Sequence, residues 1–508
     1  MAQQSQSAQL SNVAGMTRPS LRWFDFDHGD TAPSCRVCTR RNVQCDGELP
    51  RCRTCSKGGL KCPGYGVRIR WPEALATDNR DTEKSTPTTS IVRTQRGRGD
   101  RLSNIMYTRQ LSSLGLPESE SYLMQHYLKN LARVALAIDY YENGYRSLMH
   151  AGLNDPCLLN SMLAVSSSHH SKWRKSNDSE SRQYLRKAFR SLQERLKDQS
   201  LVYEETMLVA MLTLLSYEIF NGSTRWLPHY HGILGWLAAR GDCSDLNPFI
   251  KTWISMVDTQ RALNLGGCVT PEVERWLESG ALWMDVTDAI DPFFGCSVRL
   301  PKLMAAAAKL YDHSRRPAEE QELSPADLQL QARHLEAQVR DAEILISSKP
   351  SLAISCHGTK ISLHAIKDLN EREHFRRIVA AAELFRHATL LYIFRITHSP
   401  HDPLPDYLQA SVRQMYDLLT IIPDAIGPGS NLGWCLTVLG AESDPFEHRD
   451  YIRGRLWGIQ MLGLDNSKSA GKVLERVWAD RDSCRETGAT LRSWQDTMRS
   501  MGEGQILV

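Results

Sequence analysis

Six cysteines between residues 35 and 62 constrain the sequence more than any other feature. They follow a C-x2-C-x6-C spacing that occurs twice in succession, and they are Cys35, Cys38, Cys45, Cys52, Cys55 and Cys62. A CxxC pair places two sulfur atoms on one turn of backbone, and a third cysteine after six residues can fold back onto the same ion. The spacing therefore predicts a zinc site with thiolate ligands.

Counting ligands predicts how many ions the segment binds. Two tetrahedral Zn²⁺ ions need eight ligand positions, whereas the segment offers six thiolates, so two cysteines have to bridge the ions. The bridging pair should be equivalent in the two halves, and we assign it to Cys35 and Cys52, the first cysteine of each unit. Seven Lys/Arg and two Asp/Glu lie between residues 35 and 62. This positive charge lowers the pKa of nearby thiols and favours metal binding.

With Asp46 after the third cysteine and Pro50 two residues before the fourth, the segment resembles the fungal binuclear zinc cluster (zinc two, cysteine six) transcription factors. The resemblance covers about thirty residues. It implies that Cys35 and Cys52 bridge the two ions, and that a short helix after Cys38 enters the major groove and reads a short G/C-rich triplet. The resemblance also implies that the protein binds double-stranded DNA and is located in the nucleus.

The residues between the second and third cysteines depart from the family pattern. Arg40 and Arg41 keep positive charge, but Thr39, Asn42 and Gln44 stand where the family usually has Arg or Lys. An amide suits adenine in the major groove, whereas Arg suits guanine. We therefore expect Arg41 to recognise guanine, and the standard triplet to be weakened or altered at one base. The residues expected to contact DNA are Arg40, Arg41, Asn42, Gln44, Arg53, Arg68 and Arg70.

Positive charge is concentrated near the cysteines. Residues 1–110 carry 18 Lys/Arg against 10 Asp/Glu, and the rest of the chain carries 43 against 48. The segment 63–72 adds Arg68 and Arg70 beside Trp71. It is interpreted either as a strap packed on the metal centre or as a basic extension along the DNA backbone. Positive charge thus lies where a phosphate backbone would lie.

Composition divides the 508 residues into four parts. Residues 1–34 are expected to form a disordered tail without a secretory signal, because they lack both a basic start and an apolar run. The zinc module at 35–62, with its extension 63–72, is followed by a polar linker at 73–115. The longest uncharged apolar stretch, 206–217, is too short to span a bilayer, so no membrane partner is expected.

Residues 116–508 show the periodicity of amphipathic helices and few strand signals. Helices are expected at 180–198, 201–220, 225–239, 326–347, 371–397, 404–421 and 470–498, with breaks such as 423–433. In the first, the expected buried face is Leu185, Phe189, Leu192 and Leu196; in the second it includes Leu208, Met211, Leu212 and Leu215. The fold class is therefore mainly α: a small N-terminal zinc module, a linker and a large all-α regulatory domain. The strings AVSSSHH (164–170) and DPFFGCSVRLPKLM (291–304) resemble the fungal-specific regulatory domain.

An enzyme is not expected from this sequence. The candidate ligands or catalytic groups are His169, His170, His229, His231, Asp285, Asp288 and Asp291. Their spacing fits no established zinc motif, and the hydrolase, zincin, P-loop and dinucleotide motifs are missing. Core packing is expected for Trp226, Trp236, Trp253, Trp276 and Trp283, and buried thiols for Cys157, Cys243, Cys268, Cys296, Cys356, Cys435 and Cys484.

The sequence thus predicts a sequence-specific regulator of RNA polymerase II transcription. The resemblance implies control of a metabolic or secondary-metabolite gene cluster. A single module reads few base pairs and no coiled-coil heptads follow it, so we expect a homodimer through the helical domain, with co-regulators or a small-molecule effector as further partners. The alternative is a zinc-containing nuclear interaction protein or co-regulator with weak, non-specific DNA binding.

Overall fold

The computed structural model contains two compact units. The first holds the short helix α2 (Arg53–Lys57) and most of α4 (Glu118–His126), and the second begins at His126. The residues that the structure describes are 38, 41, 43–44, 53–60, 115–139, 143–198, 200–279, 282, 289–344, 351–354, 359–361, 369–488, 491–502 and 504–507. The expected tail, the extension 63–72 and the linker up to residue 114 lie outside them.

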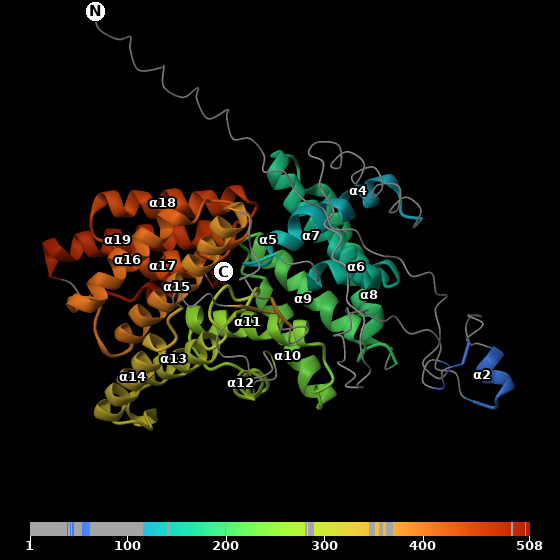
Figure 1. Cartoon of the computed structure of the whole chain (residues 1–508), viewed down its shortest axis with the longest axis horizontal. Coiled ribbons are helices and arrows are strands. Elements are labelled where there is room, and N and C mark those ends of the chain that lie inside the picture. Colours follow the sequence, from blue (N-terminus) through green and yellow to red (C-terminus); the bar gives the residue numbers. More distant parts are fainter. Residues whose placement is uncertain are drawn as a thin grey trace, which may run out of the picture. The chain divides into compact units, whose positions relative to one another are not determined.

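The second unit consists almost entirely of helices, which confirms the predicted fold class (Figure 1). Its elements are the π-helical turn η1 (Tyr127–Leu131), α5 (Ala132–Val134), α6 (Gly144–Leu153), α7 (Pro156–Arg174), α8 (Ser179–Leu196), α9 (Glu205–Phe220), α10 (Trp226–Arg240), α11 (Pro248–Leu265), α12 (Pro271–Glu278), β1 (Ala289–Ile290), α13 (Leu300–Ser314), η2 (Ala318–Glu320), α14 (Pro325–Arg340), β2 (Ser351–Ile354), β3 (Thr359–Ile361), α15 (Leu369–Thr397), α16 (Asp406–Ile421), η5 (Pro428–Asn431), α17 (Gly433–Glu442), α18 (Phe446–Met461), α19 (Asn466–Thr487) and α20 (Trp494–Ser500).

The sequence supplies caps that fix where several helices begin and end. The Asp155 carboxylate accepts hydrogen bonds from the backbone N–H groups of Cys157 and Leu158 at the start of α7, and the Ser324 hydroxyl accepts one at the start of α14. A proline follows each cap at the first helical position, where a missing N–H costs nothing. Gly488 ends α19 with a φ of 70°, a conformation that glycine adopts readily.

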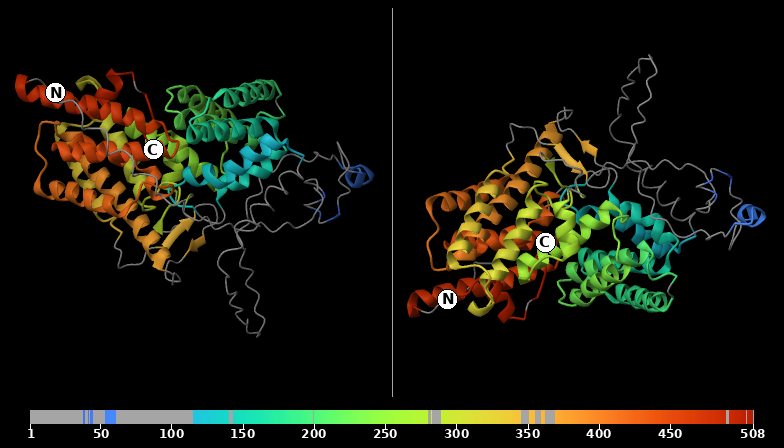
Figure 2. Two further views of the ribbon diagram at one scale, coloured as in Figure 1. Left: turned by 90° about the horizontal axis from the view of Figure 1, so that it is seen from above. Right: turned by 90° about the horizontal axis from the view of Figure 1, so that it is seen from below.

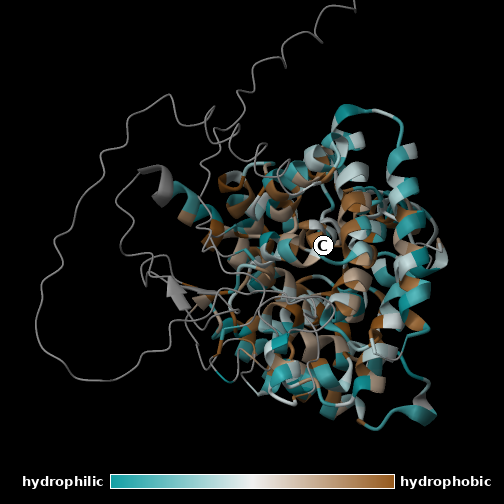
Figure 3. Cartoon of the chain, turned by 90° about the vertical axis from the view of Figure 1, so that its right-hand side faces the viewer, coloured by the Kyte–Doolittle hydropathy of each residue, from teal (hydrophilic) through white to brown (hydrophobic). Residues whose placement is uncertain are grey.

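Two helices form the centre of the second unit. Residues 206–219 of α9 are all buried, including the predicted Leu208, Met211, Leu212 and Leu215. Residues 378–394 of α15 are likewise all buried, and α15 packs against α13, α14, α16 and α17. Figure 3 shows apolar residues gathered where helices face one another and polar residues turned outward. Burial on all sides explains why neither helix shows a clear polar stripe.

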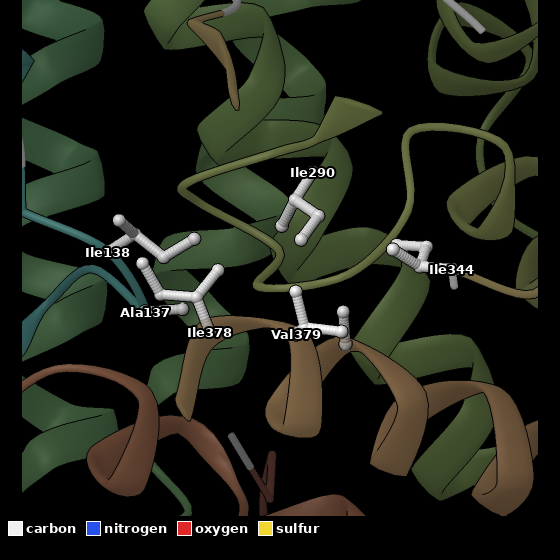
Figure 4. Close-up of a cluster of buried hydrophobic side chains, with 7 residues drawn as sticks. Ala137, Ile138, Ile290, Ile344, Ile378 and Val379 are labelled. Carbon is white, nitrogen blue, oxygen red and sulfur yellow. The ribbon is translucent and has the colours of Figure 1, made fainter. Parts of the chain in front are cut away.

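The three strands form a small sheet at the margin of the helical unit (Figure 2). β1 pairs with β2 in parallel, with Ala289 opposite Ser351, and β2 pairs with β3 in antiparallel. A buried cluster joins β1 to α15 and to the loop after α5, as Figure 4 shows. Its members are Ala137, Ile138, Ile290, Ile344, Ile378, Val379 and Ala382.

The predicted buried face of α8 was wrong in direction. Leu196 is 57% exposed, and the other three residues of the predicted face are only half-buried. The buried side chains are Ser181, Tyr184 and Ala188, which lie roughly 75° further round the helix. Because serine and alanine are small, they let the backbone of α8 approach its neighbours closely, and the larger leucines remain at the edge of the contact.

Three predicted helix boundaries were also wrong. The run 470–498 consists of two helices, α19 and α20, which are separated after Gly488; the run 326–347 ends at Arg340; and residues 201–204 are turns. The described part of the chain contains no helix that is long and apolar enough to cross a membrane. Of the seven remaining cysteines, four are buried as expected, Cys268 is exposed, Cys484 is half-buried and Cys356 lies outside the described residues.

Candidate metal centre and DNA-reading segment

The helix α2 places one predicted zinc ligand at a fixed position. Cys55 is the middle residue of this helix and is 1% exposed. The backbone N–H of Gly59 bonds to the carbonyl of Ser56, and the N–H of Leu60 bonds to that of Cys55. With Gly59 at a φ of 64°, this is a Schellman motif, in which glycine is favoured because it adopts the left-handed conformation without a Cβ clash. The motif turns the chain sharply two residues before the last cysteine.

The two halves of the cysteine segment meet in the structure. The Sγ atoms of Cys38 and Cys55 lie 3.7 Å apart, and both side chains are buried. The Thr54 hydroxyl also donates to the carbonyl of Gln44 at 3.4 Å. A tetrahedral zinc ion with Zn–S bonds of about 2.3 Å separates neighbouring sulfur atoms by about 3.8 Å. The paired thiols therefore fit a zinc centre in donor type and in spacing.

The other four predicted ligands, Cys35, Cys45, Cys52 and Cys62, lie outside the described residues. Among the residues that are described, no group of three or more His, Cys, Asp or Glu side chains is arranged to hold a metal ion. The structure therefore brings together one predicted ligand from each half of the segment, Cys38 and Cys55. Bound zinc would cross-link the two halves of the segment, as structural zinc sites do in small modules that cannot build a core of their own.

Three of the residues expected to contact DNA are described, and all three are exposed. They are Arg41, Gln44 and Arg53. The guanidinium of Arg41 lies beside Gly58 at the end of α2, because a Cβ built on that glycine would be 3.5 Å from Arg41 Nη1. Arg40, Asn42, Arg68 and Arg70 lie outside the described residues, so their predicted contacts with DNA stay predictions.

The histidines that could have formed a second metal site have other partners. Nε2 of His169 lies 2.9 Å from the Leu462 carbonyl, and Nδ1 lies 2.8 Å from Nε2 of His126. The amide nitrogen of Asn130 lies 3.0 Å from Nδ1 of His126. A carbonyl only accepts hydrogen bonds, so the His169 Nε2–H donates to it, and the His126 Nε2–H donates to His169 in turn. Both imidazoles are thus neutral.

Two of the other candidate catalytic groups, Asp291 and His229, have structural roles. The Asp291 carboxylate accepts from the backbone N–H groups of Phe293 and Phe294 and so caps a turn. His229 stacks on Phe189 with ring centroids 5.7 Å apart, and burial lowers its pKa. His231 is exposed. Trp226, Trp236, Trp253 and Trp276 are all buried in the core, as predicted, and Trp283 lies outside the described residues.

Comparison with protein families agrees with this geometry. The family model of the fungal Zn(2)-Cys(6) binuclear cluster domain matches residues 33–72. The family model of the fungal specific transcription factor domain matches residues 121–508, which is well over half of the chain. The chain belongs to the fungal specific transcription factor domain family. A search of curated proteins and a search of solved structures returned no significant match.

Membership of this family gives the helical unit a general role. A fungal transcription factor domain preceded by a zinc cluster domain is the organisation of a zinc-binding, DNA-binding transcription regulator. The resemblance stated from the cysteines and from residues 164–170 and 291–304 is thereby confirmed. In the described structure, the segment 164–170 lies in α7, where residues 164–169 are all buried, and Asp291 caps the turn after β1.

Two features of the fungal transcription factor domain were missed by sequence reasoning. The hydrogen bond between His126 and His169 joins residues 43 positions apart, and no local sequence pattern predicts it. The second feature is a row of cations on α8 at Arg182, Arg186 and Arg190. Their four-residue spacing is a helical period in the sequence, and it runs beside the period of the leucines of the same helix.

Proposed function

We propose that the protein is a sequence-specific regulator of RNA polymerase II transcription that acts in the nucleus. The observation that carries the proposal is the approach of Cys38 and Cys55 to 3.7 Å, which joins the two halves of the cysteine segment as a zinc centre requires. In this proposal all six cysteines bind zinc, and residues 40–44 enter the major groove. Arg53, Arg68 and Arg70 add contacts to the phosphate backbone.

The proposed centre holds two zinc ions per chain, bridged by Cys35 and Cys52. Zinc supplies the cross-links that hold such a short segment in one conformation. In this arrangement Cys38 and Cys55 bind different ions, and two terminal ligands on different ions lie further apart than two ligands on one ion. The separation of 3.7 Å is instead that of ligands on one ion. Binding of both ions is therefore expected to move these two sulfur atoms apart.

Metal analysis and X-ray absorption of the zinc-loaded full chain test this arrangement. Two zinc ions per chain and a zinc–zinc scattering contribution are expected. One zinc per chain would contradict the bridged centre and would favour a single ion that Cys38 and Cys55 share.

We further propose that the chain works as a homodimer through the helical domain and that its targets include a metabolic or secondary-metabolite gene cluster. The proposed boundaries are a zinc module at 35–62, a linker at 73–115 and a regulatory domain from residue 116. One module reads few base pairs, which supports a second subunit. Co-regulators or a small-molecule effector would act on the regulatory domain.

Selection from a randomised duplex library with the zinc-loaded full chain tests the function. A recovered motif with two half-sites would support a dimeric regulator, and a motif with one half-site would contradict dimerisation. Recovery of no motif, together with weak binding that falls steeply with salt, would favour an interaction protein with non-specific DNA affinity. The uncharged side chains Thr39, Asn42 and Gln44 are the observation that favours this second function.

A further inference from the structure

The outer face of α8, together with Lys197 at its C-terminal cap, carries four cations in one row. Arg182, Arg186, Arg190 and Lys197 are exposed, and they lie within about 80° of arc because successive residues of an α-helix are 100° apart. Gln193 lies within the same arc. The row is about 22 Å long at 1.5 Å per residue. We call these four cations the basic face. The basic face lies on the side of α8 opposite its buried residues. The buried side is the one that packs against α7, the neighbouring helix in Figure 1.

The fold does not use the basic face. Within the described part of the chain its four cations make no ion pair, and one weak bond, from Arg182 Nε to the Asp178 carbonyl at 3.4 Å, is their only hydrogen bond there. The acids of the same helix, Glu180 and Glu194, lie outside the arc of the basic face. Four positive charges are therefore left facing the solvent side by side.

Several other arginines of the helical unit are paired with carboxylates. Arg453 on α18 contacts both Asp450 and Glu475, and Arg316 on α13's C-terminal side contacts Asp312. The part of the chain after residue 110 also has more Asp/Glu (48) than Lys/Arg (43). A row of four unneutralised cations is thus a local departure from a surface that is acidic on balance.

We propose that the basic face binds the phosphate backbone of DNA beside the site read by the zinc module. Arginine, lysine and amide side chains are among the groups that contact DNA phosphates. The basic face presents arginine and lysine side chains together with Gln193. A protein partner would need an apolar or aromatic centre as well, whereas Leu196, about 40° outside the arc, is the only large apolar side chain exposed on α8. The chemistry of the face therefore fits a polyanion with regularly repeated charge.

The composition of the zinc module gives a reason for extra contacts, and this argument rests on the proposed DNA binding. Thr39, Asn42 and Gln44 supply no charge where relatives have cations, so the module alone makes fewer phosphate contacts. The 54 residues between Leu60 and Gly115 can span at most about 190 Å. That limit leaves the helical unit free to reach DNA on either side of the module's site.

The test compares the full chain with a variant in which Arg182, Arg186, Arg190 and Lys197 are all changed to Gln. Binding to a 40-base-pair duplex that contains the selected site is measured from 50 to 300 mM salt. Each lost phosphate contact lowers the slope of log K against log salt by about 0.9, so a fall of about 2 to 4 units and a weakening of at least about tenfold are expected. The preferred base sequence should not change.

A matched control removes the same charge elsewhere. Lys302, Arg333, Arg413 and Arg492 are exposed on other parts of the helical unit, and their change to Gln should leave the slope within about one unit of the wild type. A second control uses a duplex trimmed to the half-site, on which the basic-face variant and the wild type should bind alike. Far-UV circular dichroism checks that both variants are folded.

Each outcome separates this inference from the function on which it rests. If the wild type shows no zinc-dependent binding to any duplex, the proposed function fails. If the wild type binds but the basic-face variant keeps its slope, or if the control variant loses as much, the inference is overturned. If the basic-face variant no longer binds poly-glutamate but keeps the wild-type salt slope on DNA, the basic face binds an acidic protein partner. That outcome would also overturn the inference.

Discussion

Nε2 of His126 lies 2.8 Å from Nδ1 of His169, and this bond is the central link of a chain that runs from Asn130 to the Leu462 carbonyl. It connects the end of α4 with α7 and with the turn between α18 and α19. Burial, as the main cause, lowers the pKa of His126 to about 2 and that of His169 to about 4. Protonating either ring would remove an acceptor from the chain.

Acid should therefore destabilise the helical unit. Both imidazoles have a pKa near 6.5 in the unfolded chain, so below this pH the unfolded chain binds protons that the folded chain does not. The free energy of unfolding should be independent of these groups above pH 6.5. It should then fall by up to about 1.4 kcal/mol per pH unit for each histidine, down to about pH 4 for His169 and about pH 2 for His126. Urea unfolding at pH 8, 6.5, 5.5 and 5 measures the decline.

A double variant isolates the pair. His126→Gln with His169→Gln removes both titrating groups, so the free energy of unfolding should decline less steeply with falling pH. Burial also lowers the pKa of His387, to about 3, so part of the decline in unfolding free energy should remain in the double variant. The exposed His231→Gln serves as the control and should keep the wild-type slope. An unchanged slope in the double variant would show that the pair does not cause the acid sensitivity.

Gly463 should tolerate no side chain. Its φ is 93°, and a Cβ at this position would lie 2.7 Å and 2.8 Å from two ring atoms of His169. We expect Gly463→Ala to lower the free energy of unfolding by about 2 kcal/mol or more. Gly471→Ala is the matched control: the residue lies inside α19 with no atom within 4 Å of a built Cβ, and a gain of about 0.5–1 kcal/mol is expected. Equal effects in urea unfolding would refute the predicted clash.

Removal of zinc should separate the functions of the two units. A chelator is expected to weaken binding to the selected duplex at least about a hundredfold, because the cysteine segment is too short to fold without metal. The far-UV circular dichroism of the helical unit should remain nearly unchanged. Cys55→Ser should weaken binding similarly, whereas Cys484→Ser, in α19, should not. Fluorescence anisotropy measures both, and loss of binding in both variants would point to general misfolding.

Base preference should depend on two neighbouring residues. Arg41→Ala is expected to cost about 1–3 kcal/mol of discrimination at one guanine, since arginine bonds to guanine with two hydrogen bonds. Asn42→Lys should change the preferred base at one position towards guanine. Both variants are compared with the wild type by duplex selection. An identical motif from wild type and Asn42→Lys would contradict a role for Asn42 in reading the sequence.

Chemistry that depends on residue type and spacing could be predicted from the sequence. The C-x2-C-x6-C repeat predicted that the two halves of the segment converge, because metal ligands must meet whatever the intervening residues are, and Cys38 and Cys55 lie 3.7 Å apart. The repeat did not predict that these two cysteines would be the pair in contact. The helical periodicity likewise gave the burial of Leu208 and Leu215 in α9. Gly488 indicates a helix end within 470–498, but the apolar period continues on both sides of it, so a single helix was predicted there.

Features set by tertiary packing could not be predicted in this way. The leucines of α8 recur at helical spacing, yet Tyr184 and Ala188 face the core, because the choice of face depends on how closely the neighbouring helix can approach. The bond between His126 and His169 depends on where α4 ends relative to α7. Neither fact follows from the sequence near those residues.

The exposure of the basic face has a consequence for how this protein can evolve. Because Arg182, Arg186, Arg190 and Lys197 are exposed and make no ion pair in the described structure, exchanging any of them should change stability by no more than about 0.5 kcal/mol. Mutations in the basic face are therefore expected to affect fitness only by changing what the face binds. Duplicated genes with this fold could strengthen or lose that attachment in single steps, while the core continues to fold as before.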